Sequence, residues 1–200
     1  KAIADEPNSA AKLIESANHR TELDSHANMV VLGRHCRIIS RGKMVRVNAF
    51  SPEHAPVWKP IVDAIVSYMD EKSGKVYILM FHNAIFVKEM ENNLIPPFIM
   101  REAGMIVDDV PKIHCSTPTK YNHSLRWPEE KDLLIRLRLY GIFSYFPTSR
   151  CSETGWNGDE KVLHMTPQGE TWNPNSDHYA TNEDSLVDFE GDIIQEPDRI

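Results

Sequence analysis

The stretch TELDSHANMVVLG, residues 21–33, sets the fold and the function that this sequence predicts. Leu23 is an apolar residue of the kind that ends a strand, and Asp24 follows it directly. Small residues come next, and the apolar run 29–32 then ends at Gly33, as a short buried strand would. The pattern predicts two strands joined by a turn that carries an acid.

The residues around Asp24 allow two interpretations of its role. An acid flanked by apolar and small residues is sheltered, and a sheltered carboxylate must be paired, hydrogen-bonded or protonated, which favours a functional acid. Alternatively, Asp24 forms an ordinary turn in which Ser25 caps the backbone. The wider sequence has to decide between them.

The segments downstream are typical of β-structure. Residues 44–49 alternate, 61–69 are rich in β-branched residues, and 76–87 are apolar almost throughout, which predicts a strand covered on both faces. DEKSGK, residues 70–75, predicts a turn between the last two, and the Pro-rich segment 51–60 predicts a long loop.

Two short helices are predicted. One runs from Phe98 to Ala103, because Pro97 suits a first helical turn and Gly104 suits the position just past a helix end. The other covers residues 10–17, with Ser9 as its N-cap.

A second hairpin is predicted between residues 123–127 and 133–146. Apolar residues alternate with arginines in the later segment, as in a half-buried strand, and Gly141 predicts a bulge or bend there. The sum is a mainly β domain with one short helix near its end.

The residues L-D-S-H-A, 23–27, resemble the active-site segment of the retropepsin-like aspartic proteases of copia-type retrotransposons, in the variant of algal elements that carries His in the Gly place. HNAIFVKEMENNLIPPFIMREAG, 82–104, is similar to the family's late strand, N-L-[LI] helix and closing Gly. YGIFSYFPTSR, 140–150, and WNPNSDHYATNEDSLVDFEG, 172–191, resemble the segments that come next in those elements. The likeness covers most of residues 21–191, and the ordered series is more specific than D-S-H-A alone.

The resemblance implies a retropepsin-like closed β-barrel over residues 21–150, after an N-terminal extension, 1–20. It also implies that two identical chains each present Asp24 across a two-fold axis. Two carboxyls held that close share one proton, so that one acts as base on a water and the other polarises the scissile carbonyl. The resemblance thus implies a homodimer and a polypeptide substrate, with no metal and no other cofactor.

The residue roles implied by the resemblance fall on the same short segment. Asp24 matches the catalytic acid, and Ser25 matches the hydroxyl residue that bonds across the dimer beneath the two acids. Ala27 matches the small residue under the substrate backbone. Asn28 stands where most relatives have an Asp that contacts the substrate main chain, and it keeps the hydrogen-bonding capacity without the charge.

His26 and Trp58 are the remaining predicted substrate contacts. His26 either tunes the two acids and touches substrate, or is a tolerated substitution that points away. The segment 51–60 falls where the family places its flap, with Trp58 near the tip over the substrate. The alternative is a plain surface loop with a partly buried Trp.

Charge and cysteine content predict an acidic tail and a reducing compartment. Residues 151–200 hold twelve acids against Lys161 and Arg199, a net charge of −10, which leaves +3 for the first 150 residues of a chain whose net charge is −7. That composition predicts an acidic, partly disordered C-terminal linker or tail. Three cysteines without CxxC spacing argue against a disulfide framework or a zinc knuckle and favour a reducing compartment.

Partners and location complete the prediction. The sequence shows no basic cluster suited to nucleic acid, no apolar run of membrane-spanning length and no secretory signal at its start, so we expect neither nucleic-acid nor membrane binding. We expect an aspartic endopeptidase that acts on its own retrotransposon polyprotein, in the cytoplasm within virus-like particles. Two alternatives stay open: an inactive peptide-binding module of the same fold, and a β-rich enzyme that uses Cys36 as nucleophile.

Overall fold

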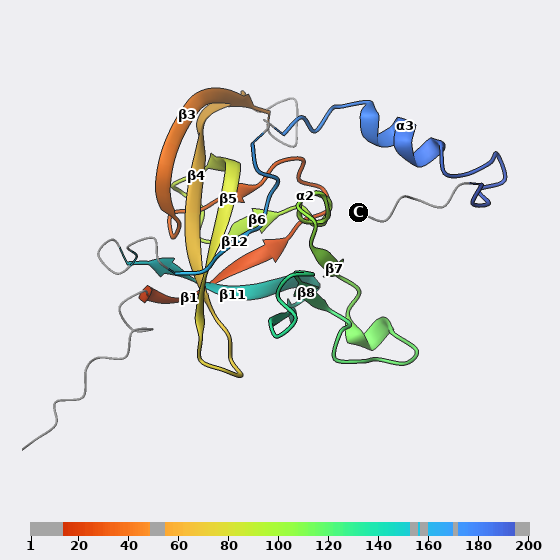
Figure 1. Cartoon of the computed structure of the whole chain (residues 1–200). Helices are drawn as coiled ribbons and strands as arrows, with labels where there is room; N and C mark the ends of the chain where they lie inside the picture. The colour runs from red at the N-terminus through yellow and green to blue at the C-terminus, as the bar shows by residue number, and fades with distance from the viewer. Residues whose placement is uncertain (1–13, 49–54, 153–155, 157–159, 170–171, 195–200) are drawn as a thin grey trace, which may run out of the picture. The chain divides into compact units, whose positions relative to one another are not determined.

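The structure is a computed structural model that describes residues 14–48, 55–152, 156, 160–169 and 172–194. The chain divides into two compact units, Lys1–Glu170 and Thr171–Ile200. The first unit is mainly β (Figure 1). Its strands are β1 Ile14–Leu23, β2 Val31–Leu32, β3 Arg37–Val47, β4 Val57–Met69, β5 Val76–Phe86, β6 Asn93–Ile95, β7 Ile106–Asp108, β8 Ser124–Arg126, β9 Leu134–Arg136, β10 Arg138–Tyr140, β11 Phe143–Cys151 and β12 Val162–His164.

The larger sheet runs in the order β10-β11-β1-β6-β2-β5-β4-β3 and returns on itself. The return is made by β4 and β11, where Ser67 lies opposite Ser149 and its hydroxyl donates to the Ser149 carbonyl at 3.1 Å. Six strands therefore form a ring of hydrogen-bonded neighbours. The mainly β prediction is confirmed.

The long antiparallel strands β3, β4 and β5 lie side by side in Figure 1, and β3 arches away from the ring. β5 is buried along most of its length, as its apolar sequence predicts. The turn at residues 70–75 is also confirmed, with Gly74 at φ 69°. Large apolar side chains are fully buried in the first unit, among them Leu32, Ile65, Ile78, Phe81 and Phe146.

The predicted helix near the end of the domain is present as α2, Pro97–Glu102, with Pro97 in its first turn. Gly104 follows it at φ 79°, the left-handed conformation that glycine adopts without strain. A small second sheet, β7-β8-β9, comes next in the chain, with the 3-10 helix η1, Lys112–His114, between β7 and β8.

Three predictions differ from the structure. Residues 14–17 of the predicted N-terminal helix belong to β1, because pairing with β11 outweighs a weak helix propensity, and residues 10–13 lie outside those described. Residues 57–60 of the predicted loop open β4. Residues 133–146 form no single strand, because Leu137 separates β9 from β10 and Gly141, at φ 58°, turns the chain into β11.

The acidic extension contributes to the fold more than its composition predicts. β12 pairs with β5 in parallel, and Leu163 and Met165 are buried. The apolar residues of this segment are too few to stand out in the sequence 151–200, where acids dominate the composition. The second unit holds helix α3, His178–Asp184, and a turn closed by a bridge between Val187 and Ile193. Within that unit the Trp172 and Tyr179 rings lie 5.5 Å apart.

Candidate functional site

Asp24 stands at the point where β1 leaves the sheet. β1 and β6 run in parallel with Leu23 opposite Ile95, and the Asp24 backbone N–H donates to the Ile95 carbonyl at 3.1 Å. β2 pairs with β6 on its other side. The segments L-D-S-H-A and N-N-L-I-P-P, far apart in sequence, therefore meet at Asp24.

A buried polar network fixes these strands beneath the acid. Thr21 of β1 and Thr148 of β11 hydrogen-bond through their hydroxyls at 2.9 Å. The Asn93 amide of β6 donates to the Thr21 hydroxyl at 3.0 Å and accepts the Gly33 N–H at 2.9 Å. All four residues are buried. A satisfied buried network of this kind holds its strands in one register.

The residues after Asp24 form a tight turn. The His26 backbone N–H donates to Asp24 Oδ1 at 2.9 Å, and the Ser25 hydroxyl lies 3.5 Å from His26 Nδ1. Asp24 is half-buried, whereas Ser25 and His26 are exposed. The bond from His26 uses one carboxylate oxygen and leaves the other for a partner.

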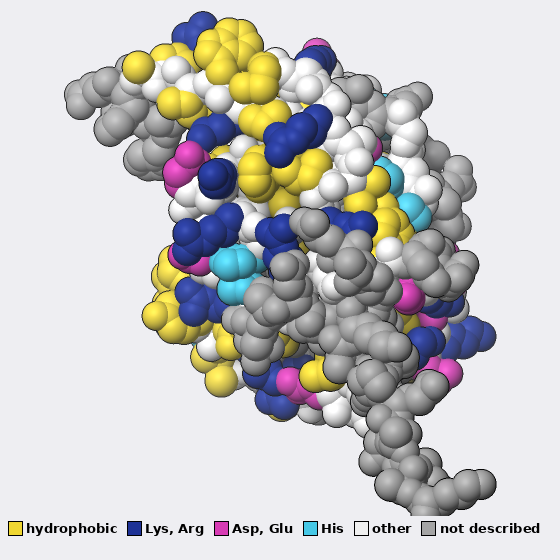
Figure 2. All heavy atoms as spheres, turned by 90° about the vertical axis from the view of Figure 1, so that its left-hand side faces the viewer, with side chains coloured by type: hydrophobic (Ala, Val, Ile, Leu, Met, Phe, Trp, Pro, Cys, Tyr) yellow, Lys and Arg dark blue, Asp and Glu magenta, His cyan; other side chains and the backbone are white. Residues whose placement is uncertain are grey.

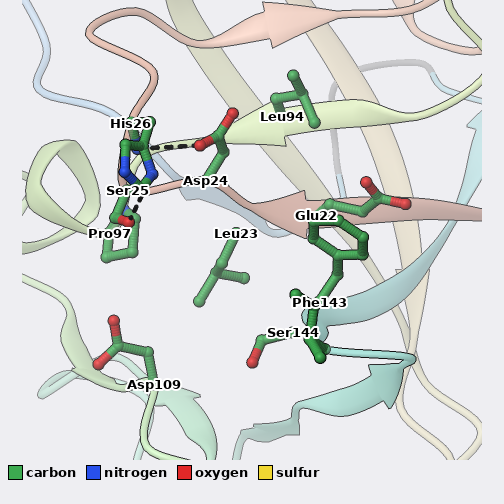
Figure 3. Close-up of a pocket in the computed structure, with 11 residues that line it drawn as sticks. Glu22, Leu23, Asp24, Ser25, His26, Leu94, Pro97, Asp109, Phe143 and Ser144 are labelled. Atoms are coloured by element: carbon green, nitrogen blue, oxygen red, sulfur yellow. Dashed lines mark hydrogen bonds between the residues drawn. The ribbon is translucent and has the colours of Figure 1, made fainter.

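The turn opens into a cavity of about 290 Å³. Figure 3 shows Ser25 and His26 beside Asp24, with Pro97 of α2 close to them and Phe143 and Ser144 of β11 on the far side. The cavity thus brings together three of the predicted site residues. Its lining is Glu22, Leu23, Asp24, Ser25, His26, Leu94, Pro97, Asp109, Ile142, Phe143 and Ser144.

A second acid, Asp109, lines the same cavity but does not pair with Asp24. Its carboxylate forms an ion pair with Arg101 at 3.1 Å, and Figure 3 shows it on the opposite side from Asp24. Glu22, the third acid of the lining, is likewise paired elsewhere, with Arg20 at 3.0 Å.

The other predicted site residues lie outside this cavity lining. Ala27 is half-buried and Asn28 is exposed in the loop between β1 and β2. Trp58 is 63% exposed on β4, opposite Arg46 of β3, at the end of that hairpin where residues 48–56 connect the two strands. The structure thus brings Asp24, Ser25 and His26 together, and it leaves the contact expected of Trp58 untested.

Sequence reasoning missed the contribution of the β10–β11 turn. Ile142 is 88% exposed and Phe143 is 54% exposed, and both line the cavity. Apolar residues on either side of Gly141 were the available signal, because apolar side chains in a tight turn seldom find cover within their own chain.

A group of potential metal ligands lies elsewhere in the first unit. Nitrogen and carboxylate atoms of His19, His35 and Glu91 fall within 4.8 Å of one another. However, the two rings are stacked with centroids 3.2 Å apart, so one ion cannot lie in the plane of both. Arg34 also forms an ion pair with Glu91. This arrangement fits a hydrogen-bonded cluster better than a metal centre.

Comparison of the chain with protein-family models, curated proteins and solved structures found no match. Within the described residues, no helix has the length and apolar character needed to cross a membrane. The function therefore has to be inferred from the residues themselves.

Proposed function

We propose that this chain is an aspartic endopeptidase of the copia-type retropepsin class, with Asp24 as its catalytic acid. Two chains would bring their Asp24 carboxyls together across a two-fold axis, where the pair shares a proton and activates a water. The substrate would be the element's own polyprotein, cleaved in the cytoplasm between apolar or aromatic residues in extended conformation. The ring of strands would then be a retropepsin-like closed β-barrel.

The observation that carries the proposal is the meeting of two distant segments. The resemblance to retropepsins depends on two segments, L-D-S-H-A and N-L-I followed by a helix. The Asp24 backbone N–H donates to the Ile95 carbonyl, and this bond joins the two segments. An aspartate that only forms a turn does not need contact with this second segment. A catalytic acid does require such support, because its carboxylate has to be held in one orientation.

The shape of the cavity supports a dimer. Asp24 has no acid partner among the residues that line its cavity, since Asp109 is paired with Arg101 and Glu22 is paired with Arg20. The exposed apolar turn at Ile142 and Phe143 borders the same cavity and offers a surface that a second copy would cover.

A second candidate function is an inactive peptide-binding module of the same fold. The bond from His26 N–H to Asp24 Oδ1 favours it, because this is the turn that a structural aspartate makes. Asn28 favours it as well, since the expected charge is missing. This candidate predicts peptide binding without cleavage.

A cleavage assay on the purified full chain separates the two functions. We expect hydrolysis of peptides with paired apolar residues, sensitivity to pepstatin, and loss of activity by at least about 10³-fold in Asp24→Asn. Asp132→Asn, an exposed aspartate outside the cavity, is the matched control and should keep full activity. Peptide binding without any cleavage by the wild-type chain would favour the inactive module.

A further inference from the structure

A second groove, of about 830 Å³, lies on the first unit away from Asp24. Five cationic side chains line it, and they come from the β2–β3 loop, from β3, from the segment after β5 and from β11. They are Arg34, Arg37, Arg41, Lys88 and Arg150. None of the lining residues is shared with the Asp24 cavity, so a role for this groove is independent of the proposed protease function.

The face that carries β3 in Figure 1 is turned to the viewer in Figure 2. Lys and Arg side chains gather there around histidines and between apolar side chains. The sequence hides this cluster, because its members are spread from residue 34 to residue 150 and no two of them are adjacent.

Three of these guanidinium groups contact neutral groups, whereas Arg34 forms an ion pair with Glu91. Arg37 donates to the Ser152 carbonyl at 2.7 Å, and Arg150 donates to the Arg34 carbonyl at 3.1 Å. The Arg41 guanidinium lies 5.6 Å from the centre of the Phe86 ring. Ordered guanidinium groups lose less side-chain entropy when they bind an anion.

The positive charge affects the neighbouring histidine. The pKa of His35 is lowered, first by burial and then by the nearby His19, Arg34 and Arg150. The charges of Arg34 and Arg150, which add to the effect of burial at His35, favour an anion in the groove. The same positive charge argues against a cation at the adjacent His19, His35 and Glu91.

We propose that this groove binds the sugar-phosphate backbone of a single-stranded nucleic acid. Arginine forks match the oxygens of a phosphodiester, and several cations along one groove can follow a chain of phosphates. Phe86 adds an aromatic ring on which an unpaired base can stack. An acidic peptide would pair with the cations but has no base to stack on the Phe86 ring. The bases of a duplex already stack on one another, so they are not free to stack on the ring.

The test uses the full chain and a fluorescent oligothymidylate, with anisotropy measured over a range of KCl concentrations. We expect binding that weakens steeply with salt. Replacing the exposed Arg41 and Lys88 by Ala should weaken binding at least about tenfold and lower the salt slope by about 1.4, since each single-strand phosphate contact contributes about 0.7. Lys72→Ala with Lys131→Ala removes two exposed charges outside the groove and should leave both quantities unchanged.

Four results would overturn the inference. They are absence of binding at low salt, an equal loss in the control variant, equal affinity for a duplex of the same sequence, and displacement of the oligonucleotide by polyglutamate at equal charge concentration. The last two would assign the groove to a duplex or to an acidic protein. Circular dichroism of both double variants checks that the fold is intact.

Discussion

The side-chain amide of Asn93 donates to the hydroxyl of Thr21 at 3.0 Å, and this bond joins β6 to β1 three residues before Asp24. The other end of the same amide accepts the Gly33 N–H at 2.9 Å. One buried side chain therefore links the strand that carries the acid, the strand beside it and the end of β2. The position of Asp24 depends on this link.

Asn93→Ala should destabilise the fold. It leaves the buried Gly33 N–H without its acceptor, which costs about 2 kcal/mol. For a chain of this length, that corresponds to a fall of roughly 4–8 °C in melting temperature. Asn48→Ala, at an exposed position, is the control and should melt with the wild type. Equal melting temperatures for Asn93→Ala and the wild type would show that the network contributes nothing to stability.

Gly33→Ala should be more damaging than Gly42→Ala. A Cβ added at Gly33 would lie 2.5 Å from the Met90 carbonyl oxygen, so backbone must move, at a cost of about 1–3 kcal/mol. At Gly42 the nearest atom is 3.6 Å away, an ordinary contact, and the substitution should be tolerated. Urea unfolding of the two variants measures the difference. A smaller loss at Gly33 than at Gly42 would contradict the close approach.

The sequence predicted the elements whose signals are local. The apolar run 76–87, and Pro97 and Gly104 around α2, specify their own structure because burial and backbone restriction act within each segment. Asp24 was predicted from a local motif in the same way.

The missed features depend on partners distant in sequence. Pro60 indicated a loop, yet it lies in β4 opposite Met44, where pairing with β5 has not begun and the missing N–H costs no bond on that side. The groove cations gather only because β3 and β11 both pair with β4. No window of sequence contains both Arg41 and Arg150.

The buried thiols should resist alkylation at neutral pH. Burial raises the pKa of Cys36 to about 11 and that of Cys151 to about 12, so both stay protonated and poorly nucleophilic. Iodoacetamide should therefore modify the less buried Cys115 first in the folded chain, and all three cysteines in urea. Mass spectrometry counts the labels. Rapid labelling of Cys36 in the folded protein would revive the alternative in which Cys36 is a catalytic nucleophile.

Stability should fall as the pH drops below about 6.5. The pKa of His164 is lowered by burial and then by His82, whose Nε2 lies 3.0 Å from His164 Nδ1, with Asp63 3.7 Å from the other nitrogen of His82. Because the folded value lies below the ordinary value of about 6.5, the unfolded chain takes up the proton first as the pH falls. The pKa values of His19, His35 and His123 are lowered too, so the effects add.

His164→Gln should flatten this dependence, because it removes one of the groups that bind protons more weakly in the folded chain. The measurement is the urea midpoint at about pH 7.5 and about pH 5.5, on either side of the ordinary histidine value. His114→Gln, at an exposed position in η1, is the control and should keep the wild-type dependence. A midpoint for His164→Gln that falls as much as the wild type's would exclude His164 from the linkage.

The exposed turn beside the Asp24 cavity should carry the association of two chains. Ile142→Ser removes a side chain that is 88% exposed, so it should leave the monomer fold intact while weakening both dimerisation and peptide cleavage. Ile113→Ser, at a residue 77% exposed in η1, is the matched control and should change neither. Sedimentation velocity across a dilution series reports the association. An unchanged dimer in Ile142→Ser would place the interface elsewhere on the chain.

Mixing wild-type chain with an excess of Asp24→Asn should inhibit cleavage beyond simple dilution. Asp109 is held by Arg101 and Glu22 by Arg20, so the proposed active site needs an Asp24 from both chains, and a mixed dimer holds only one. At a fixed amount of wild type, activity should fall with the fraction of partners that are wild type, down to roughly one tenth at a ninefold excess of the variant. Asp132→Asn added in the same excess keeps its own Asp24, so the total activity should rise roughly tenfold instead of falling. Full activity at every mixing ratio, from a species that sediments as a monomer, would refute the shared site.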